Sequence, residues 1–177
     1  MTQTKNGNIV LIGFMGVGKG ALARRIVELD SSLYALDTDD MIESFTNKKI
    51  KKIFATSGER AFRALEQRTA DWLATNVQNA VISTGGGFFQ VKNLDKIGTV
   101  VYLKADFDWI VRRILNAPNA KKKLKKRPLF QDVQKAKELY ENRKERYEAV
   151  ADIVIDAMQE DRSALAREVL QAVRSGV

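Results

Sequence analysis

The stretch that decides the fold is Ile9-Val10-Leu11-Ile12-Gly13-Phe14-Met15-Gly16-Val17-Gly18-Lys19-Gly20. Four consecutive aliphatic residues predict a strand buried on both faces, and the helix-forming residues 21–29 follow the glycine-rich turn. Gly13, Gly18 and Lys19 stand at the spacing G-x-x-x-x-G-K, in which backbone N–H groups approach phosphate oxygens and the lysine reaches the outer phosphates. The positive end of the following helix also attracts anions. A strand, loop and helix in this order predict a phosphate-binding loop.

One position departs from the usual pattern of such loops. A Ser or Thr after the lysine normally places a hydroxyl on Mg²⁺, whereas this chain has Gly20 followed by Ala21. A plain strand-to-helix turn is the competing interpretation, but it gives no reason for Lys19. We expect the following residues to bind the phosphates of a nucleotide: Gly13, Gly16, Val17, Gly18, Lys19, Gly20 and Ala21.

Length and composition narrow the range of functions. The 177 residues have the length of one domain, expected to span 1–177, which needs neither a metal nor a disulfide to fold. The chain has no cysteine and no histidine, which excludes disulfides, thiolate nucleophiles and imidazole-based triads. Any general base must be Asp, Glu, Lys or Tyr, or a water that they orient. No apolar leader and no run of about 18 apolar residues occurs, so we expect a cytoplasmic protein without a membrane partner.

The net charge of +8 suits anionic small substrates as well as nucleic acid. Much of the excess lies in residues 121–127, Lys-Lys-Lys-Leu-Lys-Lys-Arg, where no aromatic side chain offers bases a stacking surface. A solvated or phosphate-attracting segment is therefore favoured over a nucleic-acid surface. Residues 116–130 lack apolar periodicity and contain Arg127-Pro128, which predicts a mobile lid whose Arg127 folds over a phosphate.

Strands and helices alternate along the rest of the chain. The expected strands are 33–36, 80–83, 99–103 and 153–155, of which 33–36 and 80–83 are expected to be buried. The expected helices are 41–76 with breaks near 46–47 and 57–58, then 108–115, 133–150 and 163–173. Phe62, Leu65 and Trp72 are expected in the core. Five strands in this order predict a parallel sheet with helices on both sides, which is a three-layer αβα sandwich.

Acidic residues follow the strand expected at 33–36. In open α/β folds, ligands bind beyond the carboxyl ends of parallel strands, so Asp37 and Asp39 are expected to face the same crevice as the phosphate loop. Two carboxylates at such a position can divide their work between the water shell of Mg²⁺ and a substrate hydroxyl. The alternative is that Asp39 or Asp40, or with less support Asp37, only caps the helix expected to begin near Met41.

Two further features point toward a ligand. Arg63 and Glu66 stand at i and i+3 on one helix face, where an exposed ion pair is the simpler interpretation. Three consecutive glycines, 85–87, follow the strand expected at 80–83. Since one glycine normally suffices for a turn, three predict that the backbone approaches a ligand closely.

The sequence resembles the shikimate kinases, a family of the nucleoside-monophosphate-kinase-like P-loop group, over nearly its whole length. The matching stretches are Ile12 to Lys19, Leu36 to Asp39, Gly58-Glu59 with Phe62-Arg63 and Glu66, Ser83 to Gly87, Arg127-Pro128-Leu129, and Arg143 with Tyr147 and Ala151-Asp152. Many NTPases share the phosphate loop, whereas the other stretches in this order are far more selective. The resemblance implies a P-loop kinase fold and ATP-dependent phosphorylation of the 3-hydroxyl of shikimate, a step toward aromatic amino acids.

The resemblance also implies a role for each site residue. Asp39 would contact the reacting hydroxyl as the base, and Asp37 would hold the water shell of Mg²⁺. Arg63 and Arg143 would bind the substrate carboxylate, which a planar guanidinium matches with two parallel hydrogen bonds. The other implied members are Lys19 at the phosphates, Arg113 near adenine, Arg127 on the transferring phosphate, Glu66 beside Arg63, and Gly85, Gly86 and Gly87 at the substrate.

The missing hydroxyl at Gly20 bears on Mg²⁺ binding. Mg²⁺ commonly keeps several waters, so a water can take the vacated position while Asp37 and Ser83 help to hold the shell. Loss of an outer-shell partner typically costs about 10- to 100-fold in metal affinity or activity. The expectation is therefore a kinase that is impaired or that demands more Mg²⁺.

Three alternatives remain open at the level of the sequence. A catalytically silent protein that binds shikimate or a nucleotide is favoured by Gly20 alone. A kinase of another small polyol acid, such as gluconate, is compatible with Arg63 and Arg143, because they recognise a carboxylate and not a ring. An RNA-associated NTPase would use the lysine run at 121–126. The favoured interpretation remains a monomeric enzyme with ATP, Mg²⁺ and shikimate as its ligands and no nucleic-acid partner.

Overall fold

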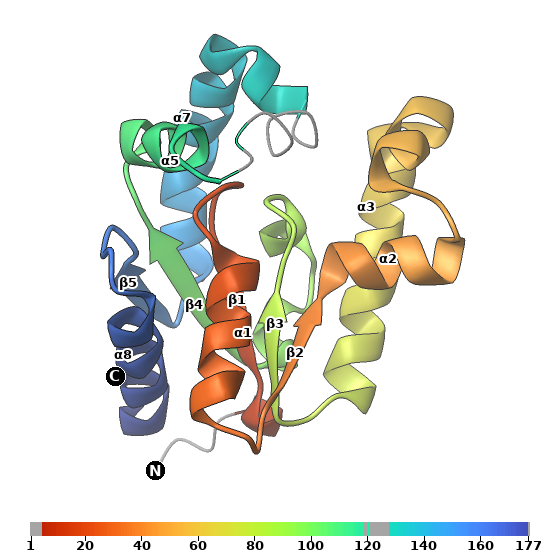
Figure 1. The fold of residues 1–177 in the computed structure, drawn as a ribbon. Coiled ribbons are helices and arrows are strands. Elements are labelled where there is room, and N and C mark those ends of the chain that lie inside the picture. The colour runs from red at the N-terminus through yellow and green to blue at the C-terminus, as the bar shows by residue number, and fades with distance from the viewer. Residues whose placement is uncertain (1–4, 119, 121–127, 177) are drawn as a thin grey trace.

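A parallel sheet forms the centre of the computed structural model, which describes residues 5–118, 120 and 128–176. In this part of the chain the strand order is β2-β3-β1-β4-β5 (Figure 1). The strands are β1 (Ile9–Ile12), β2 (Tyr34–Asp37), β3 (Ala80–Ser83), β4 (Thr99–Lys104) and β5 (Ile153–Asp156). Because β1 occupies the middle of the sheet, the loop after it lies between the ends of β3 and β4.

Helices cover both faces of this sheet, which confirms the predicted three-layer αβα sandwich (Figure 1). One face carries α1 (Lys19–Leu29) and α8 (Arg162–Ser175), which pack against each other. The other face carries α3 (Ile50–Asn76), α4 (Leu94–Ile97) and α7 (Val133–Val150). The remaining described elements are α2 (Thr38–Thr46), α5 (Phe107–Leu115) and the short 3-10 helices η1 (Lys5–Gly7), η2 (Phe88–Gln90) and η3 (Pro128–Gln131). None of the helices in the described ranges combines the length and apolarity needed to cross a membrane.

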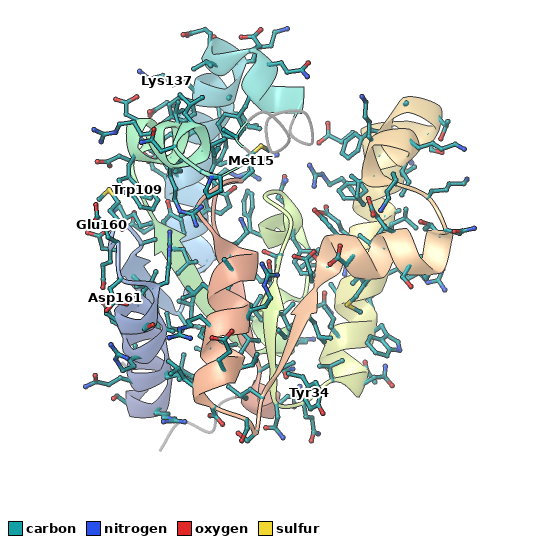
Figure 2. All side chains as sticks on the ribbon, viewed as in Figure 1. Met15, Tyr34, Trp109, Lys137, Glu160 and Asp161 are labelled. Atoms are coloured by element: carbon teal, nitrogen blue, oxygen red, sulfur yellow. The ribbon has the colours of Figure 1, made fainter. Side chains whose placement is uncertain are left out.

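Burial along the strands follows their position in the sheet. The residues of β1 are at most 3% exposed, and β3 is buried throughout, as their aliphatic runs predict. The prediction of a buried strand at 33–36 is wrong in one respect. The strand β2 forms, but it lies at the edge of the sheet, its residues are at least partly exposed, and Tyr34 is 77% exposed (Figure 2). An edge strand has a partner on one side only, so neighbouring elements cover less of it.

The helical region predicted at 41–76 contains both expected breaks. Helix α2 ends before Asn47, which adopts a left-handed φ of 51°, and Gly58 interrupts α3 with a φ of 77°. Phe62 is buried and Leu65 packs against its cluster, as expected. Trp72, however, is 51% exposed and is not a core residue. The buried face of this part of α3 passes through Ala70 and Leu73, and the side chain of Trp72 points away from that face.

Asn8 is a fully buried polar residue that connects three elements, and the sequence did not single it out. Its Nδ2 donates hydrogen bonds of 2.8 Å to the carbonyls of both Val77 and Ile97, at the ends of α3 and α4. Its Oδ1 accepts from the N–H of Ala80, at the start of β3, at 3.0 Å. Buried backbone groups need hydrogen-bond partners, and this one side-chain amide supplies a partner to three backbone groups at the base of the sheet.

We expect Asn8→Ala to lower the free energy of unfolding by about 2 to 4 kcal/mol, because it leaves two buried backbone groups and one partly buried one without these partners. Urea denaturation measures this loss. Asn76→Ala is the control, because the exposed Asn76 amide also donates to a carbonyl, that of Trp72, but without burial. A loss for Asn8→Ala no larger than that of the control would contradict the role assigned to Asn8.

Candidate functional site

The glycine-rich loop connects β1 to α1 as predicted and encloses the Lys19 ammonium group. Gly18 is the N-cap of α1, with a left-handed φ of 104° that favours glycine and without a side chain to occupy the first N–H groups of the helix. Lys19 is only 7% exposed, and its Nζ donates to the carbonyls of Gly13 at 2.6 Å and Phe14 at 3.1 Å. The loop itself contains Gly13, Gly16, Val17 and Gly18, and the first turn of α1 contains Lys19, Gly20 and Ala21. A helix N-terminus beside a buried cation forms an anion-binding cradle.

Arg113 lies against this cradle from α5. Its Nη1 donates to the carbonyl of Gly16 at 2.8 Å, and its Nη2 lies 2.7 Å from the position that a Cβ at Gly18 would occupy. Its guanidinium also lies over the ring of Trp109, 5.9 Å from the centroid. A side chain at Gly18 would displace the guanidinium, so glycine is needed here for close approach as well as for φ. Arg113 therefore lies directly against the glycine-rich loop of the candidate site.

The predicted lid at 116–130 lies largely outside the described residues. Arg127 and the lysine run at 121–126 are among the positions that are not described. Phe130, at the end of the predicted lid, is buried and packs edge-on against Phe14 of the phosphate loop, with the ring centroids 6.2 Å apart. Tyr140 of α7 packs edge-on against the same Phe14 ring at 5.5 Å. The chain on the far side of the predicted lid is thus anchored on the phosphate loop.

Asp37, Ser83 and Gly20 come together beside the phosphate loop. Asp37 and Ser83 are partners in the register of β2 and β3, so both strands end at the same level. Asp37 Oδ2 and Ser83 Oγ lie 3.9 and 3.7 Å from the position that a Cβ at Gly20 would occupy. The residues predicted to form a metal site therefore line one small space.

Asp37 has a second task, which corrects one sequence-based alternative. Its Oδ1 accepts from the N–H groups of Asp39 at 2.9 Å and Asp40 at 3.3 Å, so Asp37 is the N-cap of α2. Asp39 and Asp40 do not cap the helix, because α2 begins at Thr38, three residues earlier than expected. The cap fixes the carboxylate of Asp37 by one oxygen and leaves the other oxygen on the side of Gly20.

Two carboxylates converge on the glycine turn after β3. Asp39 Oδ1 and Glu66 Oε1 are buried and have no hydrogen-bond partner among the described residues. They lie 2.8 and 3.4 Å from the position that a Cβ at Gly85 would occupy. Burial, reinforced by repulsion from Asp37 and Glu66, raises the pKa of Asp39 to about 7. An unpartnered buried acceptor of this kind suits a hydroxyl donated by a ligand.

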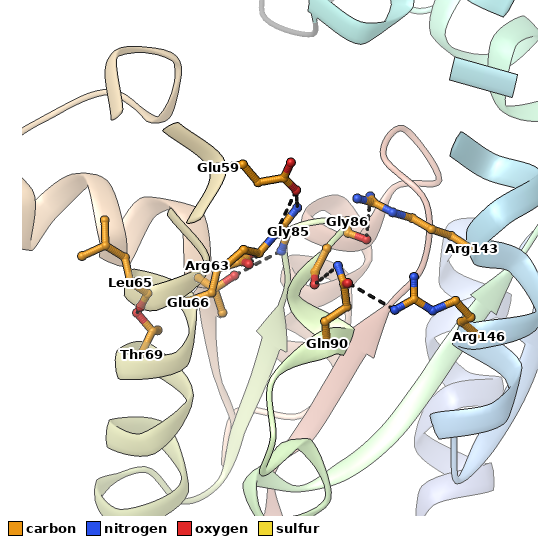
Figure 3. Close-up of polar contacts among 12 residues, drawn as sticks. Glu59, Arg63, Leu65, Glu66, Thr69, Gly85, Gly86, Gln90, Arg143 and Arg146 are labelled. Atoms are coloured by element: carbon orange, nitrogen blue, oxygen red, sulfur yellow. Dashed lines mark hydrogen bonds and ion pairs between the residues drawn. The ribbon is translucent and has the colours of Figure 1, made fainter. Parts of the chain in front are cut away.

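Two arginines face the same turn from opposite sides (Figure 3). Arg63, from α3, pairs with Glu66 at 2.6 Å and Glu59 at 3.0 Å, and its guanidinium lies directly over Gly87. Arg143, from α7, is buried and its Nη1 donates to the carbonyl of Gly86 at 3.1 Å. The interpretation of Arg63 and Glu66 as an exposed ion pair is wrong, because Glu66 is 1% exposed. Burial raises the pKa of the Glu66 carboxyl, although the bond to Arg63 opposes the shift.

Two further residues hold this turn, and neither has a role in the sequence-based predictions. Thr38, fully buried between the two aspartates, accepts a hydrogen bond from the Gly85 N–H at 3.1 Å. Tyr147 donates its hydroxyl to the carbonyl of Gly86 at 2.6 Å. A signal was present for Tyr147, because it stands four residues after Arg143 and therefore on the same helix face. For Thr38 no periodicity exists that would have indicated its partner.

The central strand, the lysine-bearing loop, Ser83 at the end of β3 and Asp37 at the end of β2 together define a P-loop kinase. A sequence profile of the family described as shikimate kinase matches residues 15–174. A shikimate kinase from Helicobacter hepaticus is 40% identical over 168 residues, which cover 94% of this chain and 95% of that protein. A shikimate kinase from Bartonella henselae is 33% identical over 180 residues, covering 98% and 81%. The chain belongs to the shikimate kinase family.

Solved structures agree with this assignment. The shikimate kinase from Acinetobacter baumannii in complex with shikimate has a TM-score of 0.80 and 32% identity, and the match covers 95% of this chain and 93% of that one. The shikimate kinase from Aquifex aeolicus has a TM-score of 0.75 and 26% identity, with 95% and 96% covered. The five-stranded parallel sheet with helices on both faces is thus the fold of these kinases.

We expect Asp39→Asn to stabilise the ligand-free protein by an amount that grows as the pH rises from 4 to 7. The folded protein keeps a proton that the unfolded chain releases near pH 4, so the wild-type stability falls through this window until the pH exceeds the folded pKa of about 7. Asparagine carries no charge, so at pH 8 we expect the free energy of unfolding of Asp39→Asn to exceed that of the wild type by about 1 to 3 kcal/mol. Urea denaturation at pH 5 and pH 8 without added metal measures the gain.

The control for this experiment is Asp40→Asn, an exposed position in the same helical turn. This variant is expected to show no such trend with pH. An equal stability difference for Asp39→Asn at the two pH values would show that the pKa of Asp39 is not raised.

Proposed function

We propose that these residues carry out the reaction of the family, the ATP-dependent phosphorylation of shikimate, at the 3-hydroxyl. The observation that carries the proposal is the position of the Asp39 carboxylate, whose Oδ1 has no hydrogen-bond partner among the described residues. It lies at the glycine turn that Arg63 and Arg143 face from either side. A small carboxylic acid bound between the two guanidinium groups would therefore present its hydroxyls toward Asp39.

Lys19, the N-terminus of α1 and Arg113 would bind the phosphates and the adjoining part of ATP. Lys19 donates to two carbonyls of its own loop, and phosphate oxygens are stronger acceptors for its ammonium group. Phosphoryl transfer depends on positioning and charge neutralisation more than on a strong base, which suits a site without histidine. Arg127 lies outside the described residues, and its place on the transferring phosphate stays a prediction.

Asp39 would orient the reacting hydroxyl and receive its proton. The hydroxyl oxygen would form the new bond to the γ-phosphorus, the bond to ADP would break, and the proton would pass to the Asp39 carboxylate. Burial and the neighbouring carboxylates make this group a better proton acceptor than an ordinary aspartate, since they raise its pKa to about 7. Glu66 would act indirectly, because its ion pair holds Arg63 in place.

The space between Asp37, Ser83 and Gly20 fits a hydrated magnesium ion. Mg²⁺ is usually held by one or two carboxylates, several waters and the substrate phosphates, and one Asp37 oxygen faces this space while its other oxygen caps α2. When bound, the ion supplies neutralisation of phosphate charge. We propose that Asp37 and Ser83 hold its waters, and that a water takes the position of the absent hydroxyl at Gly20. The expected cytoplasmic location, the single domain and the monomeric state stay predictions.

The proposed function is tested by ADP release from ATP by the purified protein, with and without shikimate, across a Mg²⁺ titration. We expect release that depends on shikimate and exceeds the release with gluconate, because the chain belongs to the shikimate kinase family. Calorimetry with shikimate is the companion measurement. Shikimate binding without ADP release at any Mg²⁺ concentration would instead select the catalytically silent protein, and a preference for gluconate would select another sugar-acid kinase.

We expect Gly20→Ser to lower the Mg²⁺ concentration for half-maximal rate by about 10- to 100-fold, the range found for partners just outside the ligand shell. A Cβ here meets Arg24, Ser83 and Asp37 only at 3.7 to 3.9 Å, so the hydroxyl enters without strain. The control is Gly20→Ala, which adds the same Cβ and, like serine, has a higher helix propensity than glycine, but lacks the oxygen. An equal Mg²⁺ requirement for the two variants would show that the missing hydroxyl does not limit this enzyme.

A further inference from the structure

Two donors from α7 hold one carbonyl of the glycine turn. Arg143 Nη1 and Tyr147 Oη donate to the Gly86 oxygen at 3.1 and 2.6 Å. A carbonyl oxygen has two lone pairs, so both of its acceptor positions are used. The two side chains stand four residues apart on one face of α7, and this spacing lets them reach the same atom.

This double hydrogen bond sets the direction of the next N–H group. The described residues contain no cis peptide bond, and in a trans peptide the carbonyl of Gly86 and the N–H of Gly87 point in opposite directions. The Gly86 carbonyl points toward α7, so the Gly87 N–H points away from α7. On that side the Arg63 guanidinium lies over Gly87. The N–H thus points to the side of the turn from which Arg63 approaches (Figure 3).

We propose that Tyr147 is a positioning residue for the substrate. By holding the Gly86 carbonyl, it fixes the Gly86–Gly87 peptide so that the Gly87 N–H joins Arg63 and Arg143 as a third donor to the substrate carboxylate. The inference rests on the proposed function, because it takes the carboxylate of shikimate to lie between the two arginines.

Tyr147 is better suited to this task than Arg143. Arg143 has further donors that a substrate carboxylate would recruit, and its hold on the carbonyl weakens when it turns toward that ligand. Tyr147 is 1% exposed, and its ring packs against Phe89 and Tyr102 with centroid distances of 4.6 and 5.3 Å. Burial raises its pKa to about 12, so the hydroxyl remains a donor throughout the neutral range. The tyrosine therefore holds the carbonyl whether or not the substrate is present.

The chain offers a closely matched control in Tyr140. It also lies on α7, it is buried, and its hydroxyl also donates to a backbone carbonyl, that of Ala105 at 3.0 Å. Ala105 follows β4 and does not belong to the glycine turn. Tyr147→Phe and Tyr140→Phe each keep the ring and remove one buried hydroxyl, so thermal denaturation should show similar losses of stability.

Only Tyr147→Phe is expected to weaken shikimate binding. We expect its KM for shikimate and its calorimetric Kd to rise about 3- to 10-fold, the range for the loss of one neutral hydrogen bond. Its kcat and its KM for ATP should stay within about twofold of the wild type, because the reacting groups are untouched. Tyr140→Phe should leave the KM and Kd for shikimate within the same twofold limit.

Three results would overturn the inference. The first is an equal shikimate Kd for the two variants. The second is a parallel loss of kcat and of ATP affinity in Tyr147→Phe, which would indicate general loosening of the site. The third is a wild-type protein that does not bind shikimate, which would overturn the proposed function as well. If the wild type binds shikimate but releases no ADP, the proposed function fails alone, and the Kd values still decide the role of Tyr147.

Discussion

The central position of β1 in a parallel sheet is the constraint on which the site depends. Its four aliphatic residues are buried from both sides, and its hydrogen bonds to β3 and β4 leave one direction for the chain beyond Ile12. Ser83 pairs with Leu11 on one side and with Asp37 on the other. The phosphate loop and the two polar strand ends therefore begin at one edge of the sheet, which is the edge where open α/β folds bind ligands.

Charge in this site is arranged in two halves. The phosphate half is cationic, with Lys19 inside its loop and Arg113 against it. The other half buries one carboxylate oxygen each of Asp39 and Glu66 close to the glycine turn, and within the described part of the chain only Glu66 of these two has an arginine partner. The pKa of Asp39 is raised because its carboxylate is buried close to other negative charges. Burying such a group costs stability in the free protein, and groups of this kind collect where a ligand supplies the missing partner.

The glycine turn owes its shape to helices on both sides of it. Gln90 donates to the carbonyl of Gly87 and accepts from Arg146 of α7, each at 3.2 Å (Figure 3). Together with the bonds to the Gly86 carbonyl, these contacts hold the turn from α7, while Arg63 covers it from α3. Three glycines admit this crowding because a side chain at Gly85 or Gly87 would collide with Asp39 or Arg63. The turn can thus act as a rigid floor for a substrate and does not depend on its own flexibility.

The sequence by itself determined the parallel αβα fold, the phosphate loop and the family. Strong local patterns carry this information, since aliphatic runs predict central strands and glycine with lysine at a set spacing predicts a phosphate cradle. The same residues marked the candidate site, whose individual roles are still proposals. The absent hydroxyl at Gly20 was also visible, because one letter at a defined spacing is enough to show it.

Only the tertiary structure decided which strands form the edges, which oxygen of Asp37 caps α2, and which side chains hold the glycine turn. It also left Trp72 exposed, although the sequence pattern predicted a core residue. Asn8 is buried, which no sequence pattern indicated. The physical reason is the same in each case. Exposure and hydrogen-bond partners depend on elements far apart in the chain, such as Thr38 with Gly85 or Tyr147 with Gly86, and a local pattern carries no information about a partner that folding alone brings near.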